Sequence, residues 1–133
     1  MILELQRATH ATLQVLSARL VDLDLSPSEL NALGNLADGA GRTVSELGAA
    51  VGSRPTTLTG VLDRLERRGL IARGARPGDR RAVLITLTDD GAATAAVITR
   101  AIADLEADAL AGLPAATVDG ALAVLRALTE AGR

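Results

Sequence analysis

Residues 43–69 read TVSELGAAVGSRPTTLTGVLDRLERRG, and this stretch decides the fold. It opens on a capping box, in which the Thr43 side chain accepts from a free amide while Glu46 reaches back to the cap. The pattern predicts a short helix over residues 44–51. Gly52 follows at once, and glycine commonly ends helices because it tolerates the left-handed conformation. The stretch therefore begins with a short helix and a tight turn.

A second, longer helix is predicted over residues 53–68. Ser53 is expected to cap it, Pro55 suits its first turn, and Gly69 stops it. Leucines at spacings i, i+4 and i+7 predict its buried face, namely Leu58, Leu62 and Leu65. A short helix, a glycine turn and a longer helix are typical of a helix-turn-helix. In that motif the first helix braces the second, whose N-terminal part enters the major groove of DNA.

A β-hairpin is predicted directly after these helices. Residues 70–75 and 82–88 are short, and they alternate and contain β-branched side chains. Between them lies Arg76-Pro77-Gly78-Asp79-Arg80-Arg81, which is rich in turn-forming residues. A hairpin that follows a helix-turn-helix is a wing.

Helices are also predicted on both sides of this block. Residues 2–22 carry leucines at helical spacing, and Ser26-Pro27-Ser28-Glu29 is a capping box that starts another helix. Thr88 is expected to cap a long helix to about Leu110, and Pro114 to begin a last one. The order predicts a mostly α fold, a winged helix-turn-helix with flanking N- and C-terminal helices.

Charge is segregated along the chain, although its net value is only −2. Residues 1–53 have a net charge of −3, residues 54–81 of +5, and residues 82–133 of −4. A short basic segment between acidic flanks is typical of a phosphate-binding surface. A solvated, charged helix face explains the same run, so charge alone leaves both interpretations open.

The composition excludes several functions. There is no Cys, which excludes disulfides, thiolate metal sites and thiol redox sensing. The single histidine, His10, cannot form a His-rich metal cluster, and we expect no cofactor. No phosphate loop or metal motif is present, so an enzyme is not expected. Because no signal peptide or run of about 20 apolar residues is found, we expect a cytoplasmic protein without a membrane segment.

The predicted second helix has an unusual exposed start. It carries three threonines in four positions, and threonine is a mediocre helix former. Hydroxyls can bond phosphates or base edges, and threonine methyls can meet a thymine methyl. The predicted DNA contacts here are Ser53, Arg54, Pro55, Thr56, Thr57 and Thr59, with Arg64, Arg67 and Arg68 placed to meet phosphates. The plain alternative is an amphipathic helix with a polar outer face.

The wing supplies the second set of predicted contacts, which are Arg76, Asp79, Arg80 and Arg81. A narrow minor groove attracts arginine. Asp79 would weaken phosphate binding unless it has another duty, such as pairing with a nearby arginine to fix the tip. An ordinary turn aspartate is the alternative.

Residues 26–91 resemble the MarR family of winged-helix regulators. The resemblance rests on Leu25-Ser26-Pro27, on Thr43-Val44-Ser45-Glu46-Leu47, on Ser53-Arg54-Pro55-Thr56 and on residues 62–71, LDRLERRGLI. It continues in Asp79-Arg80-Arg81-Ala82-Val83 and ends at Leu87-Thr88. The Asp-Arg-Arg wing followed by Leu-Thr is fairly specific for that family. The chain departs from it in having no aromatic residue, no Cys, and Arg76 where family wings frequently have an acid.

The resemblance implies which segments of the chain bind DNA and which form the dimer. The helix at residues 53–68 would be the recognition helix, Asp79 would steady the wing, and Arg81 would reach into the minor groove. Residues 1–25 and 89–133 would be dimerisation helices around a DNA-binding domain at residues 26–88. The apolar stripes of the flanking helices would be hard to bury in so short a monomer, which agrees with a homodimer.

The sequence therefore predicts a dimeric transcriptional repressor that binds a pseudo-palindromic site on double-stranded DNA. Release by a small-molecule effector is a hypothesis drawn from the resemblance, with His10 as a candidate ligand contact; a packed or solvated histidine is the alternative. Other functions stay open: an activator, an architectural DNA-binding protein, or an interaction module that does not bind DNA.

Overall fold

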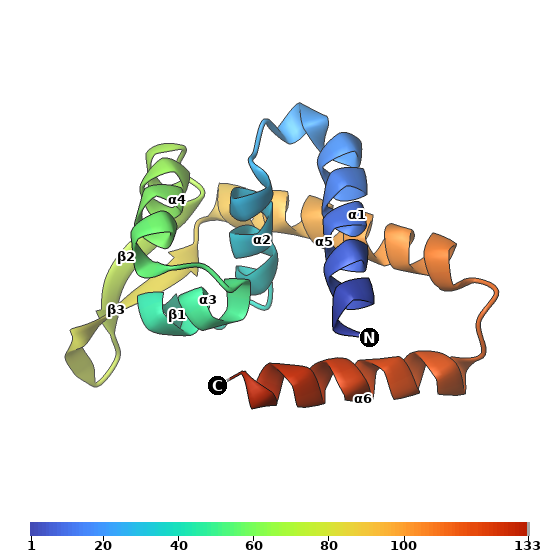
Figure 1. Ribbon diagram of the computed structural model, residues 1–133. Coiled ribbons are helices and arrows are strands. Elements are labelled where there is room, and N and C mark those ends of the chain that lie inside the picture. The colour runs from blue at the N-terminus through green and yellow to red at the C-terminus, as the bar shows by residue number, and fades with distance from the viewer. Residues whose placement is uncertain (133) are drawn as a thin grey trace. The chain divides into compact units, whose positions relative to one another are not determined.

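The computed structural model describes residues 1–132 (Figure 1). Their elements follow in the order α1 (Ile2–Arg19), η1 (Val21–Leu23), α2 (Pro27–Leu36), β1 (Arg42–Thr43), α3 (Val44–Val51), α4 (Pro55–Arg67), β2 (Ile71–Arg76), β3 (Asp79–Leu87), α5 (Asp89–Leu110) and α6 (Ala115–Ala131). The predicted mostly α, winged helix-turn-helix order is confirmed. The contacts divide the chain into two compact units, residues 1–102 and 103–133, with the division inside α5.

The two expected capping boxes and the expected Thr88 cap begin three of the helices. Ser26 Oγ accepts from the Glu29 amide at 3.2 Å at the start of α2, and Thr43 Oγ1 accepts from the Glu46 amide at 3.2 Å at the start of α3. Thr88 Oγ1 accepts from the Gly91 amide at 3.0 Å at the start of α5. These bonds satisfy amides that a helix start otherwise leaves unpaired. Short-range sequence signals thus fix where the helices begin.

The start of α4 differs from the prediction. Its N-cap is Arg54, which makes no side-chain capping bond, and Ser53 lies one residue outside. Pro55 explains the shift: proline suits the first helical position and holds the residue before it in an extended conformation. Arg54 accordingly has φ −66° and ψ 149°. The helix covers Pro55–Arg67 rather than residues 53–68.

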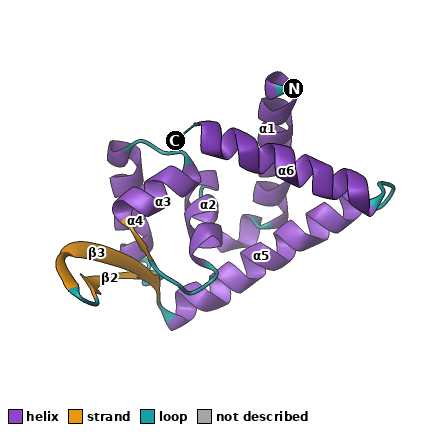
Figure 2. Ribbon diagram, turned by 90° about the horizontal axis from the view of Figure 1, so that it is seen from below, coloured by secondary structure: helices purple, strands orange, loops and turns teal. Residues whose placement is uncertain are grey.

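The three strands form an antiparallel sheet in the order β1-β3-β2. β2 and β3 reach further toward the tip than predicted, so the turn consists of Pro77 and Gly78 instead of six residues. Gly78 has a φ of +84°, and proline followed by such a glycine is the pattern of a type II turn. Figure 2 shows β2 and β3 as a ribbon extending away from α3 and α4. This ribbon is the wing.

An aliphatic core joins the helices of the first unit to the sheet. The predicted stripe of α4 is confirmed, because Leu58, Leu62 and Leu65 are at most 1% exposed. They belong to one cluster with side chains of α2, α3, the sheet and α5, including Leu33, Leu36, Leu47, Ile85 and Ile98. Leu20, which follows α1, is also buried there. The core therefore fixes α4 and the base of the wing in one frame.

The second unit consists of the last part of α5 and the whole of α6. Pro114 is the N-cap of α6. No residue of α6 is buried, and Leu122 and Leu125 are 44% and 41% exposed. Within residues 1–132, no helix combines the length and apolar character that a membrane crossing requires. The division into units says nothing about a dimerisation role, so the predicted domains 1–25, 26–88 and 89–133 stay predictions.

Candidate nucleic-acid interface

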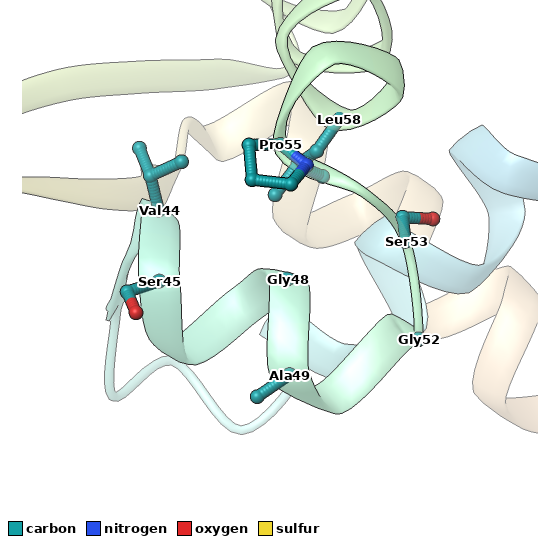
Figure 3. A pocket seen from close by; sticks show the side chains of 8 residues that line it. All are labelled: Val44, Ser45, Gly48, Ala49, Gly52, Ser53, Pro55 and Leu58. Atoms are coloured by element: carbon teal, nitrogen blue, oxygen red, sulfur yellow. The ribbon is translucent and has the colours of Figure 1, made fainter.

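The turn between α3 and α4 presents the start of α4 to solvent. Gly52 has a φ of +67°, which only glycine adopts readily, and a Cβ on Gly48 would lie 3.4 Å from Leu58 Cδ2. The two glycines let the helices meet closely. An open groove of about 600 Å³ remains between α3 and the first turn of α4. Figure 3 shows Val44 and Ser45 on one wall and Pro55 on the other.

The predicted base-reading side chains lie at this exposed start. Arg54, Thr56 and Thr57 are exposed. Thr59 is also exposed, but its hydroxyl donates to the Pro55 carbonyl at 2.8 Å. Among residues 1–132, the side chains of Arg54, Thr56 and Thr57 form no hydrogen bond or ion pair. These groups are therefore available to an external ligand.

The arginines toward the end of α4 are largely engaged within the protein. Arg64 Nε donates to Glu29 Oε1 at 2.7 Å, and Glu29 is only 5% exposed. Arg68 Nη2 donates to the Leu23 carbonyl at 2.9 Å, and its Nη1 donates to the Asp24 carbonyl. Arg64 thus ties α4 to α2, and Arg68 ties the end of α4 to the segment before α2. Phosphate contact by Arg64 or Arg68 stays a prediction, whereas Arg67 has no such partner in the described chain.

Two carboxylates of α4 are paired with one arginine of the wing. Arg73 on β2 places Nη2 2.5 Å from Asp63 Oδ1 and Nε 2.9 Å from Glu66 Oε2. Sequence analysis did not single out Arg73. It lies ten residues after Asp63, on the strand that follows α4, so an ion pair between the two could be inferred once this helix and strand were assigned.

The wing tip holds the predicted Asp79. Its Oδ1 accepts from the backbone amide of Arg81 at 3.0 Å, so this carboxylate bonds to the backbone rather than to the expected guanidinium. The Arg80 and Arg81 side chains are exposed and have no acidic partner among residues 1–132. Arg76 lies 3.6 Å from Glu46 of α3, measured from Nη1 to Oε1. The charge that Arg76 adds to the wing is therefore partly neutralised.

An ion pair between Arg42 and Asp38 fixes the loop before α3 and shifts the pKa values of both side chains. Arg42 donates from Nη1 and Nη2 to the two oxygens of Asp38, at 3.1 and 3.0 Å. The hydrogen bonds from Arg42, and then one from the Ala40 amide, lower the pKa of Asp38 below its ordinary value. The hydrogen bonds to Asp38 in turn raise the pKa of Arg42. Arg42 belongs to β1, which pairs with β3, so the pair supports the base of the wing.

His10 lies apart from these groups, exposed on α1. Its Nε2 is 3.1 Å from Nε2 of Gln14, one turn along the helix. Nothing in this position tests a ligand contact, which stays a prediction. Within residues 1–132, no group of three potential metal-ligating side chains lies together.

Comparison with known proteins agrees with this geometry. Residues 23–82 match the model described as the MarR family. The chain is similar to the MarR family over this winged helix-turn-helix block. It is 36% identical over 67 residues to the transcriptional repressor MdtR of Bacillus subtilis, which is 50% of this chain and 43% of that repressor. The chain thus matches less than half the length of this relative.

Solved structures extend the similarity to almost the whole chain. A MarR family transcriptional regulator from Silicibacter pomeroyi is 25% identical with a TM-score of 0.88, covering 96% of this chain and 86% of that one. BpsR of Bordetella bronchiseptica is 27% identical with a TM-score of 0.76, covering 94% and 89%. That BpsR study concerns regulation of its DNA binding by 6-hydroxynicotinic acid. The flanking helices therefore share the family's fold as well.

Proposed function

We propose that this protein is a transcriptional regulator that binds double-stranded DNA, with α4 in the major groove and the wing at the adjacent minor groove. The distribution of unpaired arginines carries the proposal. Of the basic side chains in residues 54–81, four have no internal partner among the described residues: Arg54 and Arg67 at the two ends of α4, and Arg80 and Arg81 on the wing. Free cations at these two places match the geometry of a winged helix on DNA.

Asp79 supports a specific role for Arg81. A carboxylate beside two exposed arginines would repel phosphates if it were free. It instead accepts from the Arg81 amide, which fixes the backbone from which that side chain projects. We infer that Asp79 orients the wing and that Arg81 enters the minor groove, where a narrow groove concentrates negative potential.

The regulator acts as a homodimer on a pseudo-palindromic operator. Apolar side chains remain exposed in the flanking helices, and such surfaces in a small protein mark an interface. They are Ile2 and Leu3 of α1, Val97 and Ile102 of α5, and Leu122 and Leu125 of α6, with exposed fractions between 40% and 66%. A two-fold dimer would place two recognition helices on successive major grooves.

Repression and ligand release complete the proposal. The relative MdtR is a repressor, and regulation of BpsR involves 6-hydroxynicotinic acid. By analogy this protein blocks transcription in the cytoplasm until a small molecule lowers its operator affinity, with His10 as a candidate contact. Titration of the operator complex with candidate effectors tests this part.

Selection of bound fragments from a random DNA pool tests the function itself. A palindromic consensus is expected, with an affinity at least about 10³ times that for random DNA. Weak, even binding would indicate an architectural protein, and no binding would indicate an interaction module.

An arginine substitution tests the wing. Arg81→Ala is expected to weaken operator binding by about tenfold or more and to reduce the salt slope by about 1. Arg100→Ala on α5 is the control, because it removes the same charge outside α4 and the wing. Equal affinities for Arg81→Ala and the wild-type protein would refute the wing assignment.

A further inference from the structure

Two carboxylates lie on the side of α4 that the proposed function turns toward DNA. Asp63 follows Thr59 by four residues and Thr56 by seven, which places the three on one stripe of the helix. Glu66 follows Thr59 by seven residues and lies on the same side. Asp63 and Glu66 are about half exposed, at 51% and 48% for their side chains. Phosphates would meet two negative charges just beyond the threonines.

Arg73 contacts both carboxylates at once. Its Nη2 is 2.5 Å from Asp63 and its Nε is 2.9 Å from Glu66, so separate nitrogens of one guanidinium serve the two acids. A planar guanidinium with donors in fixed directions can do this, whereas a lysine ammonium is a single flexible point charge. The Arg73 side chain is only 30% exposed, less than either acid. Arg73 therefore lies beside the acids instead of projecting freely like Arg81.

We propose that Arg73 is a positioning and charge-shielding residue for DNA binding, and that it acts through Asp63 and Glu66 without contacting DNA. The two acids alone carry a charge of −2; Arg73 brings the net charge of the cluster to −1 and holds the carboxylates toward β2. Because it bridges α4 and β2, it also links the recognition helix to the wing. The inference rests on the proposed function, since shielding matters only if α4 meets phosphates.

Two other roles would use the same residues. Arg73 could bind a phosphate directly, in which case its contribution would not depend on the acids. Asp63 could accept from the amino group of a cytosine, as aspartate does in some major-groove contacts. In a double-mutant cycle, each of these two roles predicts a result that differs from the one expected for charge shielding by Arg73.

The cycle compares Arg73→Gln in the wild-type protein and in the Asp63→Asn/Glu66→Gln background. Affinity is measured by fluorescence anisotropy on the selected operator at two salt concentrations. We expect Arg73→Gln to weaken binding by on the order of tenfold in the wild-type background and less than about twofold in the neutralised background. Arg73→Lys should fall between Arg73→Gln and the wild type, because it restores charge without the two-acid geometry.

The control is Arg54→Gln, which removes an arginine without an internal partner and should weaken binding equally in both backgrounds.

Equal losses for Arg73→Gln in both backgrounds would overturn the proposal in favour of phosphate contact. Weaker binding by Asp63→Asn alone, in which Arg73 still pairs with Glu66, would overturn it in favour of base reading by Asp63. Circular dichroism at the assay temperature confirms that each variant is folded. If the wild-type protein binds no DNA in the selection, the proposed function fails first, independently of this cycle.

Discussion

Gly91→Ala should destabilise the protein, although alanine usually favours a helix over glycine. Gly91 lies in the first turn of α5, and a Cβ there would be 1.8 Å from the Leu70 carbonyl oxygen. Two hydrogen bonds from Thr88, just before α5, also join this helix start to the residues that follow α4. Thr88 donates from its amide to Leu70 O at 3.1 Å and from its hydroxyl to Gly69 O at 2.6 Å. The start of α5 thus packs on the connection between α4 and β2 through a contact that only glycine permits.

The size of the effect follows from these distances. Real Cβ atoms essentially never approach a heavy atom within 3.0 Å, so the two backbones must separate by about 1.2 Å. A separation of about 1.2 Å would stretch both bonds of Thr88 to about 3.8 Å or more, beyond hydrogen-bond range. Two lost bonds and the strained packing cost about 3–4 kcal/mol, and the gain in helix propensity returns about 1 kcal/mol. The expected net loss is about 2–3 kcal/mol.

Urea unfolding followed by circular dichroism measures this loss, at one protein concentration because dimerisation would couple to stability. Gly120→Ala on α6 is the matched control: it makes the same change inside a helix, where a Cβ meets no atom within 4 Å. It should be neutral or stabilising by up to about 1 kcal/mol. Equal stabilities for the two variants would refute the close approach at Leu70.

Two smaller effects follow from ion pairs. Asp38→Asn removes a carboxylate whose pKa is lowered by Arg42, so the wild type should exceed the variant in stability above the unfolded pKa of about 3.9 and lose that advantage as pH falls below it. Urea midpoints from neutral to acidic pH measure this, and a difference that grows toward acid would contradict it. Arg76→Gln should weaken operator binding by at most about threefold, because Glu46 already partners Arg76. A loss as large as that of Arg81→Ala, in the same titration, would show that Arg76 reaches DNA.

The helices were predictable where local chemistry decides them. The capping boxes at Ser26 and Thr43 involve residues three apart, so the sequence displays them directly. The predicted N-cap of α4, Ser53, was wrong. Pro55 takes the first helical position and makes Arg54 the cap, which outweighs the capping preference of Ser53. β1 was not predicted, since two residues are too few to show a strand's alternation.

The partners of the arginines could not be read from the sequence. Glu29 and Arg64 are 35 residues apart, and only the packing of α2 against α4 brings them together. The wing strands also extend closer to the tip than their residue types indicate, because pairing of Arg76 with Asp79 continues the ladder past the bulge at Ala75. Tertiary contacts therefore decide which predicted contact residues are free to bind DNA.

Internal pairing changes the meaning of the basic segment. Its net charge of +5 includes arginines whose partners lie outside it, on α2 and α3, so a count along the sequence does not describe the surface. Where an acid or a carbonyl holds a guanidinium, the arginine contributes to the frame of the domain and less to phosphate attraction. Among the described residues, the arginines of this segment that remain unpaired are Arg54 at the start of α4, Arg67 at its end, and Arg80 and Arg81 on the wing. A chain with a net charge of −2 can thus present unpaired positive charge along α4 and on the wing, because association depends on local charge more than on the total.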